Sequence, residues 1–82
     1  MLIESQLRPD MTTITNKTEA AALLDKLAAT ARTEGSVYES RIRSNAGHLY
    51  SLRAKCNRVG QVRFWLDEEI ISRSSAIFWL GA

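Results

Sequence analysis

The chain has 82 residues, a formal net charge of +2 and one cysteine, which is the size and composition of a single small domain. The lone cysteine excludes an intramolecular disulfide, and one cysteine with one histidine supplies too few ligands for a tetrahedral zinc site, so we expect no metal and no cofactor. A run of about 18 apolar residues and a signal-peptide core are both absent, so we expect a cytoplasmic protein with no membrane segment.

The N-terminal segment lacks a periodic apolar pattern and contains the only proline, Pro9. Segments of this kind at a chain end are often loosely packed. We therefore expect residues 1–14 to form an N-terminal tail and residues 15–82 to form one domain. The sequence leaves open whether residues 1–10 are ordered.

A helix is predicted from Asn16 to about Arg32. Asn16 can cap its first turn, and Glu19, three positions later, completes a pattern that resembles a capping box. Gly35 is placed to end the helix in a left-handed conformation. The apolar residues repeat with the 3.6-residue period of one buried stripe, which consists of Ala20, Leu23, Leu24, Leu27, Ala28 and Ala31.

Three strands follow, because the apolar period changes to two. We predict strands at residues 37–44, 48–55 and 61–66, joined by turns at 45–47 and 56–60 that each contain Asn and Gly. Short connections of this kind form an antiparallel meander. The predicted fold class is therefore α+β, with an N-terminal helix packed on a three-stranded antiparallel meander.

The segment after residue 66 has two interpretations. Residues 67–69 form a polar break, and the isoleucines at 70 and 71 are expected to be buried. Ser72 can cap a short C-terminal helix over residues 73–80 that buries Ala76, Ile77 and Leu80. The alternative is a fourth strand over residues 75–80, because Ile, Phe and Trp favour strands. We favour the helix, and the alternative stays open from the sequence.

The alternation of the predicted strands sorts their side chains onto two faces. The face expected to pack on the helix consists of Tyr38, Ile42, Tyr50, Leu52, Ala54, Val62, Phe64 and Leu66. The other face includes Glu39, Leu49 and Ser51, and it is rich in basic residues, since six of the eleven lie between positions 41 and 63, where no acidic residue occurs. Such a face can simply be solvated, as one face of an antiparallel sheet often is. The alternative is a binding surface, because Arg and Trp are enriched at binding hot spots. The residues predicted to bind a partner are Arg41, Arg43, Arg53, Lys55, Arg63 and Trp65.

Residues with catalytic potential are few. His48 is a candidate general base near Tyr38 and Tyr50, as in metal-independent ribonucleases, but a histidine beside a turn is the interpretation we favour. Cys56 lies between basic residues, and we interpret it as a small half-buried side chain. Neither a glycine-rich phosphate loop nor a recognisable triad is present. We therefore predict no catalytic residue and no enzymatic activity.

Two resemblances bear on function. The order of helix, three strands and C-terminal helix over residues 16–80 resembles the double-stranded RNA-binding fold. The resemblance is one of topology only. The short chain, the two candidate start residues Met1 and Met11 and the C-terminal strand–break–helix pattern of residues 62–73 resemble small accessory proteins of phages and other mobile elements. Inhibitors of host defence, including anti-CRISPR proteins, are common among these. This resemblance implies a non-catalytic protein that acts on a host complex.

These observations lead to one predicted function and two alternatives. We predict a mobile-element inhibitor in a bacterial cytoplasm that docks on a host protein or nucleoprotein complex through the basic sheet face. The first alternative is a nucleic-acid-binding regulator that uses the same face. The second is a small ribonuclease toxin that depends on His48. A homodimer is compatible with each, since a chain this short gains stability from a partner.

Overall fold

The computed structural model describes residues 11–82 and contains two helices and a five-stranded sheet. The elements follow the order β1 (Thr12–Thr13), α1 (Lys17–Glu34), β2 (Ser36–Arg43), β3 (Leu49–Cys56), β4 (Val62–Leu66), β5 (Glu69–Ile71) and α2 (Arg73–Gly81). The strand order in the sheet is the order in the chain. β1 is parallel to β2, and the other neighbouring pairs are antiparallel. The predicted α+β class is confirmed, and the predicted meander is the centre of a larger mixed sheet.

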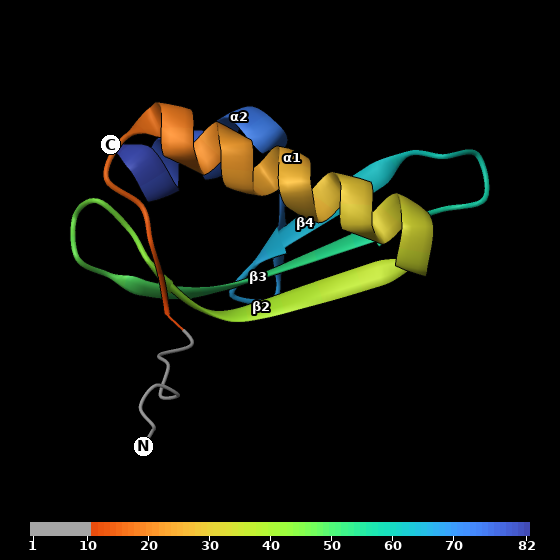
Figure 1. The fold of residues 1–82 in the computed structure, drawn as a ribbon, viewed down its shortest axis with the longest axis horizontal. Coiled ribbons are helices and arrows are strands. Elements are labelled where there is room, and N and C mark those ends of the chain that lie inside the picture. Colours follow the sequence, from red (N-terminus) through yellow and green to blue (C-terminus); the bar gives the residue numbers. More distant parts are fainter. Residues whose placement is uncertain (1–10) are drawn as a thin grey trace, which may run out of the picture.

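Both helices lie on one side of the sheet (Figure 1), and the hydrophobic core lies between this helix layer and the sheet. On the strands, Ile42, Leu52 and Ala54 are fully buried against this helix layer. The predicted stripe of α1 faces the same core, with Leu23 partly buried and its other members buried. The opposite side of the sheet has no covering layer among residues 11–82, and we call it the outer face.

Local signals set the ends of α1. The Glu19 N–H donates to Asn16 Oδ1 at 2.8 Å, which confirms the predicted cap. The Glu19 carboxylate accepts from the Thr15 N–H at 2.9 Å and from the Thr15 hydroxyl at 2.7 Å. At the other end Gly35 has φ 94°, and its N–H donates to the Ala31 carbonyl at 2.7 Å. The helix extends two residues beyond its predicted end.

The predicted tail, residues 1–14, overlaps the described chain only at residues 11–14, and residues 1–10 lie outside it. Within the overlap, Thr12 and Thr13 form β1 and pair with Ile42 and Arg43 of β2. Ile14 is 2% exposed and belongs to the core. Residues 11–14 therefore pack with the domain instead of forming a tail.

A β-bulge in β2 overturns part of the predicted face assignment. Glu39 pairs with Leu52 and Ile42 pairs with Tyr50, so three steps along β2 match two along β3. The extra residue reverses the alternation at that point. The predicted placement of Tyr38 against the helix is therefore wrong, since Tyr38 lies on the outer face. The predicted placement of Glu39 on the outer face is also wrong, because Glu39 pairs with Leu52 and lies with it on the helix-facing side.

The predicted polar break at residues 67–69 is a tight hairpin turn. Asp67 and Glu68 both have positive φ, 51° and 69°, which is the geometry of a two-residue turn in the left-handed region. The Ser51 N–H donates to Asp67 Oδ1 at 2.8 Å and ties the turn to β3. The turn brings β5 alongside β4. Ile70, expected to be buried, is 60% exposed at this edge of the sheet.

The C-terminal segment is a helix and not a fourth strand. The Ser75 N–H donates to Ser72 Oγ at 3.2 Å, which confirms Ser72 as the cap of α2. Ala76 and Leu80 are fully buried, and Ile77 is partly buried against the core. Within the described part of the chain, neither helix is long and apolar enough to cross a membrane.

Candidate functional site

The outer face carries a row of four side chains that crosses four strands. Tyr38 on β2 pairs with Arg53 on β3, Arg53 pairs with Trp65 on β4, and Trp65 pairs with Ile70 on β5. Tyr38 is 52% and Ile70 60% exposed, whereas Arg53 and Trp65 are half-buried between them. Cross-strand partners in such a row are in contact distance of one another. We call these four residues the central row.

Arg53 is held in place by its neighbours. Its Nη2 donates to Glu68 Oε2 at 3.0 Å, and its guanidinium carbon lies 5.5 Å from the centre of the Tyr38 ring. Its Nε is shielded from solvent and has no acceptor within residues 11–82. The side chain is 42% exposed, so the ion pair is worth at most about 1 kcal/mol. The main effect of these contacts is to fix the orientation of the guanidinium.

A shallow hollow lies beside the central row. It has a volume of about 380 Å³, and its lining includes Lys55, Arg58, Arg63 and Trp65. Lys55 and Arg63 are register partners, one step along the strands from Arg53 and Trp65. Among residues 11–82, the side chains of Lys55, Arg58 and Arg63 form no ion pair. The hollow, which we call the basic hollow, therefore concentrates positive charge next to an aromatic ring.

The β3–β4 turn gives the basic hollow a rigid wall. Asn57 Oδ1 accepts hydrogen bonds from the Val59 and Gln61 N–H groups, both at 3.0 Å. The Asn57 N–H also donates to the Gln61 carbonyl at 3.0 Å. Gly60 has φ 85°, a conformation that L side chains rarely adopt. An Asn that bonds its own turn in this way pre-organises the loop.

The six predicted binding residues fall into two groups. Arg53, Lys55, Arg63 and Trp65 are adjacent on the outer face. Arg43 pairs with Leu49, four residues from Arg53, which places it roughly 13 Å away along β3. Arg41 lies within the bulge, also apart from the basic hollow. All six are at least partly exposed. The sheet thus brings four of the six together and leaves two at its far end.

The sequence prediction missed Tyr38 and Ile70 as members of this site. The bulge that turns Tyr38 outward has no marker in the sequence, since it contains neither Gly nor Pro. Ile70 lies on a three-residue strand that the pattern of residues 67–71 did not reveal. Positive φ at both turn residues is typical of Asn-Gly or Asp-Gly pairs, and the Asp-Glu pair here obscures that signal.

The other candidate residues lie elsewhere. His48 is exposed in the loop just before β3, and its ring centre lies 6.3 Å from that of Tyr50. Tyr38, its other predicted neighbour, pairs with Arg53 further along the strand. Cys56 is half-buried, with Sγ 3.5 Å from the Asn57 carbonyl. Among residues 11–82, no three His, Cys, Asp or Glu side chains are grouped as metal ligands.

No protein-family model, curated protein or solved structure matches this chain. The function is therefore inferred from the chemistry of the outer face.

Proposed function

We propose that this chain is a binding protein that docks through its outer face onto an acidic, partly apolar protein surface. The observation that carries the proposal is the uncovered sheet face on which exposed Tyr38 and Ile70 lie beside Lys55 and Arg63. Exposed apolar side chains that gather on one face mark interaction sites more often than single ones do. Tyr, Trp and Arg are also the residue types most often found at binding hot spots.

The central row supplies the apolar part of the proposed contact. Trp65 is half-buried by its strand neighbours, so little side-chain entropy is lost when a partner covers it. Arg53 is already oriented by Glu68 and Tyr38, and its remaining N–H groups can donate to a partner carboxylate without rearrangement of the side chain. The basic hollow supplies electrostatic attraction, which speeds association with an acidic surface.

The biological side of the proposal follows the resemblance to mobile-element proteins. In this proposal the chain is an inhibitor of the anti-CRISPR type, and docking blocks a host protein or nucleoprotein complex by covering its surface.

A second candidate function is a nucleic-acid-binding regulator. Lys55 and Arg63 could pair with phosphate oxygens while the half-buried Trp65 stacks on a base. Its signature is an affinity that falls steeply with salt, because bound phosphates release counterions. Docking on a protein through the central row depends less on salt, since part of its free energy comes from apolar contact.

The test is a pull-down from bacterial lysate with tagged protein, with and without nuclease, using two matched variants. Lys55→Glu reverses a charge on the outer face beside Arg63, a neighbour that tolerates the new carboxylate. Lys26→Glu makes the same change on the exposed side of α1. We expect Lys55→Glu to reduce recovery of the protein partner on the order of tenfold, and Lys26→Glu to retain it.

Two results would count against the proposed function. Equal recovery of the protein partner by both variants would show that docking does not use the outer face. Recovery of nucleic acid alone, lost after nuclease treatment, would favour the regulator.

A further inference from the structure

A groove separates α1 from the β4–β5 edge of the sheet. α1 packs mainly on β2 and β3 and only marginally on β4, so the helix-facing side of the last two strands is left partly open. The groove has a volume of about 700 Å³, and its apolar lining consists of Ala28, Val62, Phe64, Ile70 and Ile71. Pockets that hold small organic molecules have volumes of about 300–1,000 Å³. The groove is therefore large enough for such a ligand.

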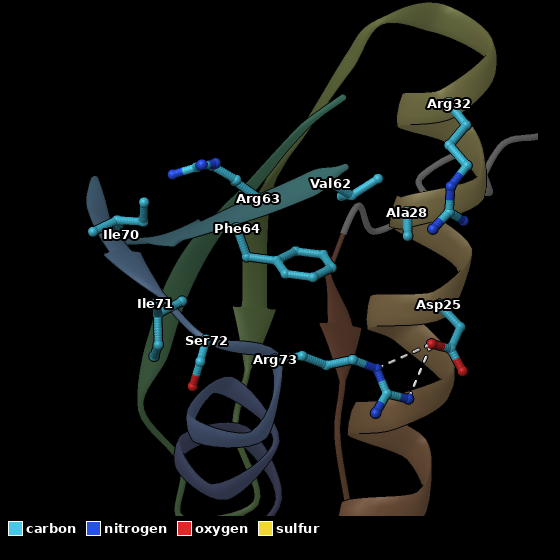
Figure 2. Close-up of a pocket in the computed structure, with 10 residues that line it drawn as sticks. All are labelled: Asp25, Ala28, Arg32, Val62, Arg63, Phe64, Ile70, Ile71, Ser72 and Arg73. Atoms are coloured by element: carbon cyan, nitrogen blue, oxygen red, sulfur yellow. Dashed lines mark hydrogen bonds and ion pairs between the residues drawn. The ribbon is translucent and has the colours of Figure 1, made fainter. Parts of the chain in front are cut away.

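Three arginines and one aspartate line this groove, so its charged side chains carry a net positive charge; they are Arg32, Arg63, Arg73 and Asp25. Figure 2 shows the Phe64 ring pointing toward α1, with the Arg32 side chain on one side of it and Arg73 reaching to Asp25 on the other. Arg73 Nε and Nη2 donate to Asp25 Oδ1 at 3.2 and 3.0 Å. These two bonds orient the Arg73 guanidinium. Its other N–H groups, about three, can donate to another acceptor. The recorded ion pairs of residues 11–82 do not involve Arg32. The local charge thus suits an anion.

The shape of the groove favours a compact ligand over an extended peptide. Pairing between β4 and β5 ends at Phe64 and Ile71, and the chain then leaves the sheet for α2. Only Val62 and Arg63 of β4 extend beyond that point without a neighbouring strand on this side. Strands of globular proteins usually have about 3–10 residues. Two free positions, closed off by the start of α2, are too few for a peptide to add as a strand.

We infer that this groove is a second binding site, which takes a small organic anion with an apolar body. The anionic group lies between the guanidinium groups of Arg32 and Arg73, and the apolar body contacts the partly exposed Val62 and Ile71 beside the buried Phe64 ring. Asp25 acts as a positioning residue, because it orients Arg73 through the two hydrogen bonds. This site opens on the helix side of the sheet, and it shares Arg63 and Ile70 at the β4–β5 edge with the outer face.

The experiment is a titration of ¹⁵N-labelled protein with sodium naphthalene-2-carboxylate at pH 7, followed by backbone amide shifts. We expect saturable shifts at Ala28, Arg32, Phe64, Ile71 and Arg73. A dissociation constant on the order of 1 mM is expected for a ligand of about 13 non-hydrogen atoms. The neutral probe 2-naphthalenemethanol should bind more weakly, because it lacks the carboxylate.

Variants assign the charge contribution. Arg32→Glu should weaken carboxylate binding by up to about fivefold, which corresponds to the loss of one exposed ion pair, and Arg32→Gln should act in the same direction with a smaller effect. Lys26→Glu, with the same charge change on the same helix but outside the groove, should stay within about twofold of the original. A well-dispersed spectrum of each variant verifies the fold.

Three results would each overturn the inference. The first is shifts centred on Lys55 and Trp65 of the outer face in place of the groove. The second is the absence of saturable shifts up to the solubility of the probe. The third is equal binding by the Arg32→Glu and Lys26→Glu variants.

Discussion

Gly81 near the end of α2 is expected to be the glycine at which alanine is least tolerated for steric reasons. A Cβ added there would lie 2.5 Å from Lys17 Cα, 2.8 Å from Lys17 N and 2.9 Å from the Asn16 carbonyl carbon. These neighbours are backbone atoms at the capped start of α1, and they cannot rotate away. The last turn of α2 thus packs against the first turn of α1 at a distance that only glycine permits.

Two opposing effects determine the outcome of Gly81→Ala. Alanine is favoured over glycine in a helix by about 0.8–1 kcal/mol. Overpacking of a well-packed contact costs about 1–3 kcal/mol, and here the obstacle is backbone. Fraying of the last turn could relieve the clash, but it would expose Leu80, which is fully buried and contributes about 1.5–3 kcal/mol. We therefore expect a net loss of about 1–2 kcal/mol in the free energy of unfolding.

Urea denaturation followed by far-UV circular dichroism measures this loss. A change of about 1 kcal/mol corresponds to roughly 4–8 °C in Tm for a domain of this size. Ser75→Ala is the matched control, because it raises helix propensity at an exposed position of α2 and keeps the backbone N–H that bonds to the Ser72 cap, and it should be neutral or slightly stabilising. If Gly81→Ala were as stable as the original protein, the close approach of the two helices would be refuted.

Three further predictions concern the core, the α1 cap and the β4–β5 turn. Leu52→Ala should lower the free energy of unfolding by about 2–5 kcal/mol, because Leu52 is fully buried on the central strand; a loss below about 1 kcal/mol in urea would contradict this. The hydrogen bonds from Thr15 hold the pKa of Glu19 below its ordinary value of 4.5, so their stabilising effect is present above pH 4.5 and is lost as the pH falls through the lowered folded-state pKa. Urea midpoints measured across acidic pH should fall less for Glu19→Gln than for the original protein, and parallel curves would refute the linkage. Glu68→Gly should be more stable than Glu68→Ala by about 1 kcal/mol, because both lose the ion pair with Arg53 and only glycine adopts φ 69° without strain; equal Tm values would argue against this.

The elements predicted correctly from the sequence are those with local signals. The cap at Asn16, the apolar stripe and Gly35 place α1 within two residues of its observed end. Ser72 likewise marks the start of α2. Caps and turn residues act on neighbours three or four positions away, so the information that determines them is contiguous in the chain.

The parts that the sequence did not reveal depend on contacts between distant segments. β1 has two residues and exists because Thr12 and Thr13 find a parallel partner in β2, about thirty positions later in the chain. β5 has three residues and is held beside β4 by a turn of unusual composition. Neither β1 nor β5 is long enough for its sequence to show the alternation of apolar and polar residues that predicts a strand.

The candidate site shows the same division. The alternation of residues along the predicted strands placed Arg53, Lys55, Arg63 and Trp65 on one face, because the register of β3 and β4 is regular. One extra residue in β2 decided that Tyr38 joins this face, and the hairpin at residues 67–68 decided that Ile70 does so. A bulge forms only when the register of two strands is settled against a shared core.

The sequence by itself therefore determined α1, the three central strands and the excess of positive charge between residues 41 and 63, and it favoured α2 without excluding a strand. Tertiary structure decided which side chains meet: the central row, the basic hollow and the groove behind β4 and β5 each join residues from several elements. The physical reason is that helix caps and strand alternation are short-range properties of the chain. A binding face is defined by register and packing between elements, and those are settled only when the whole domain folds.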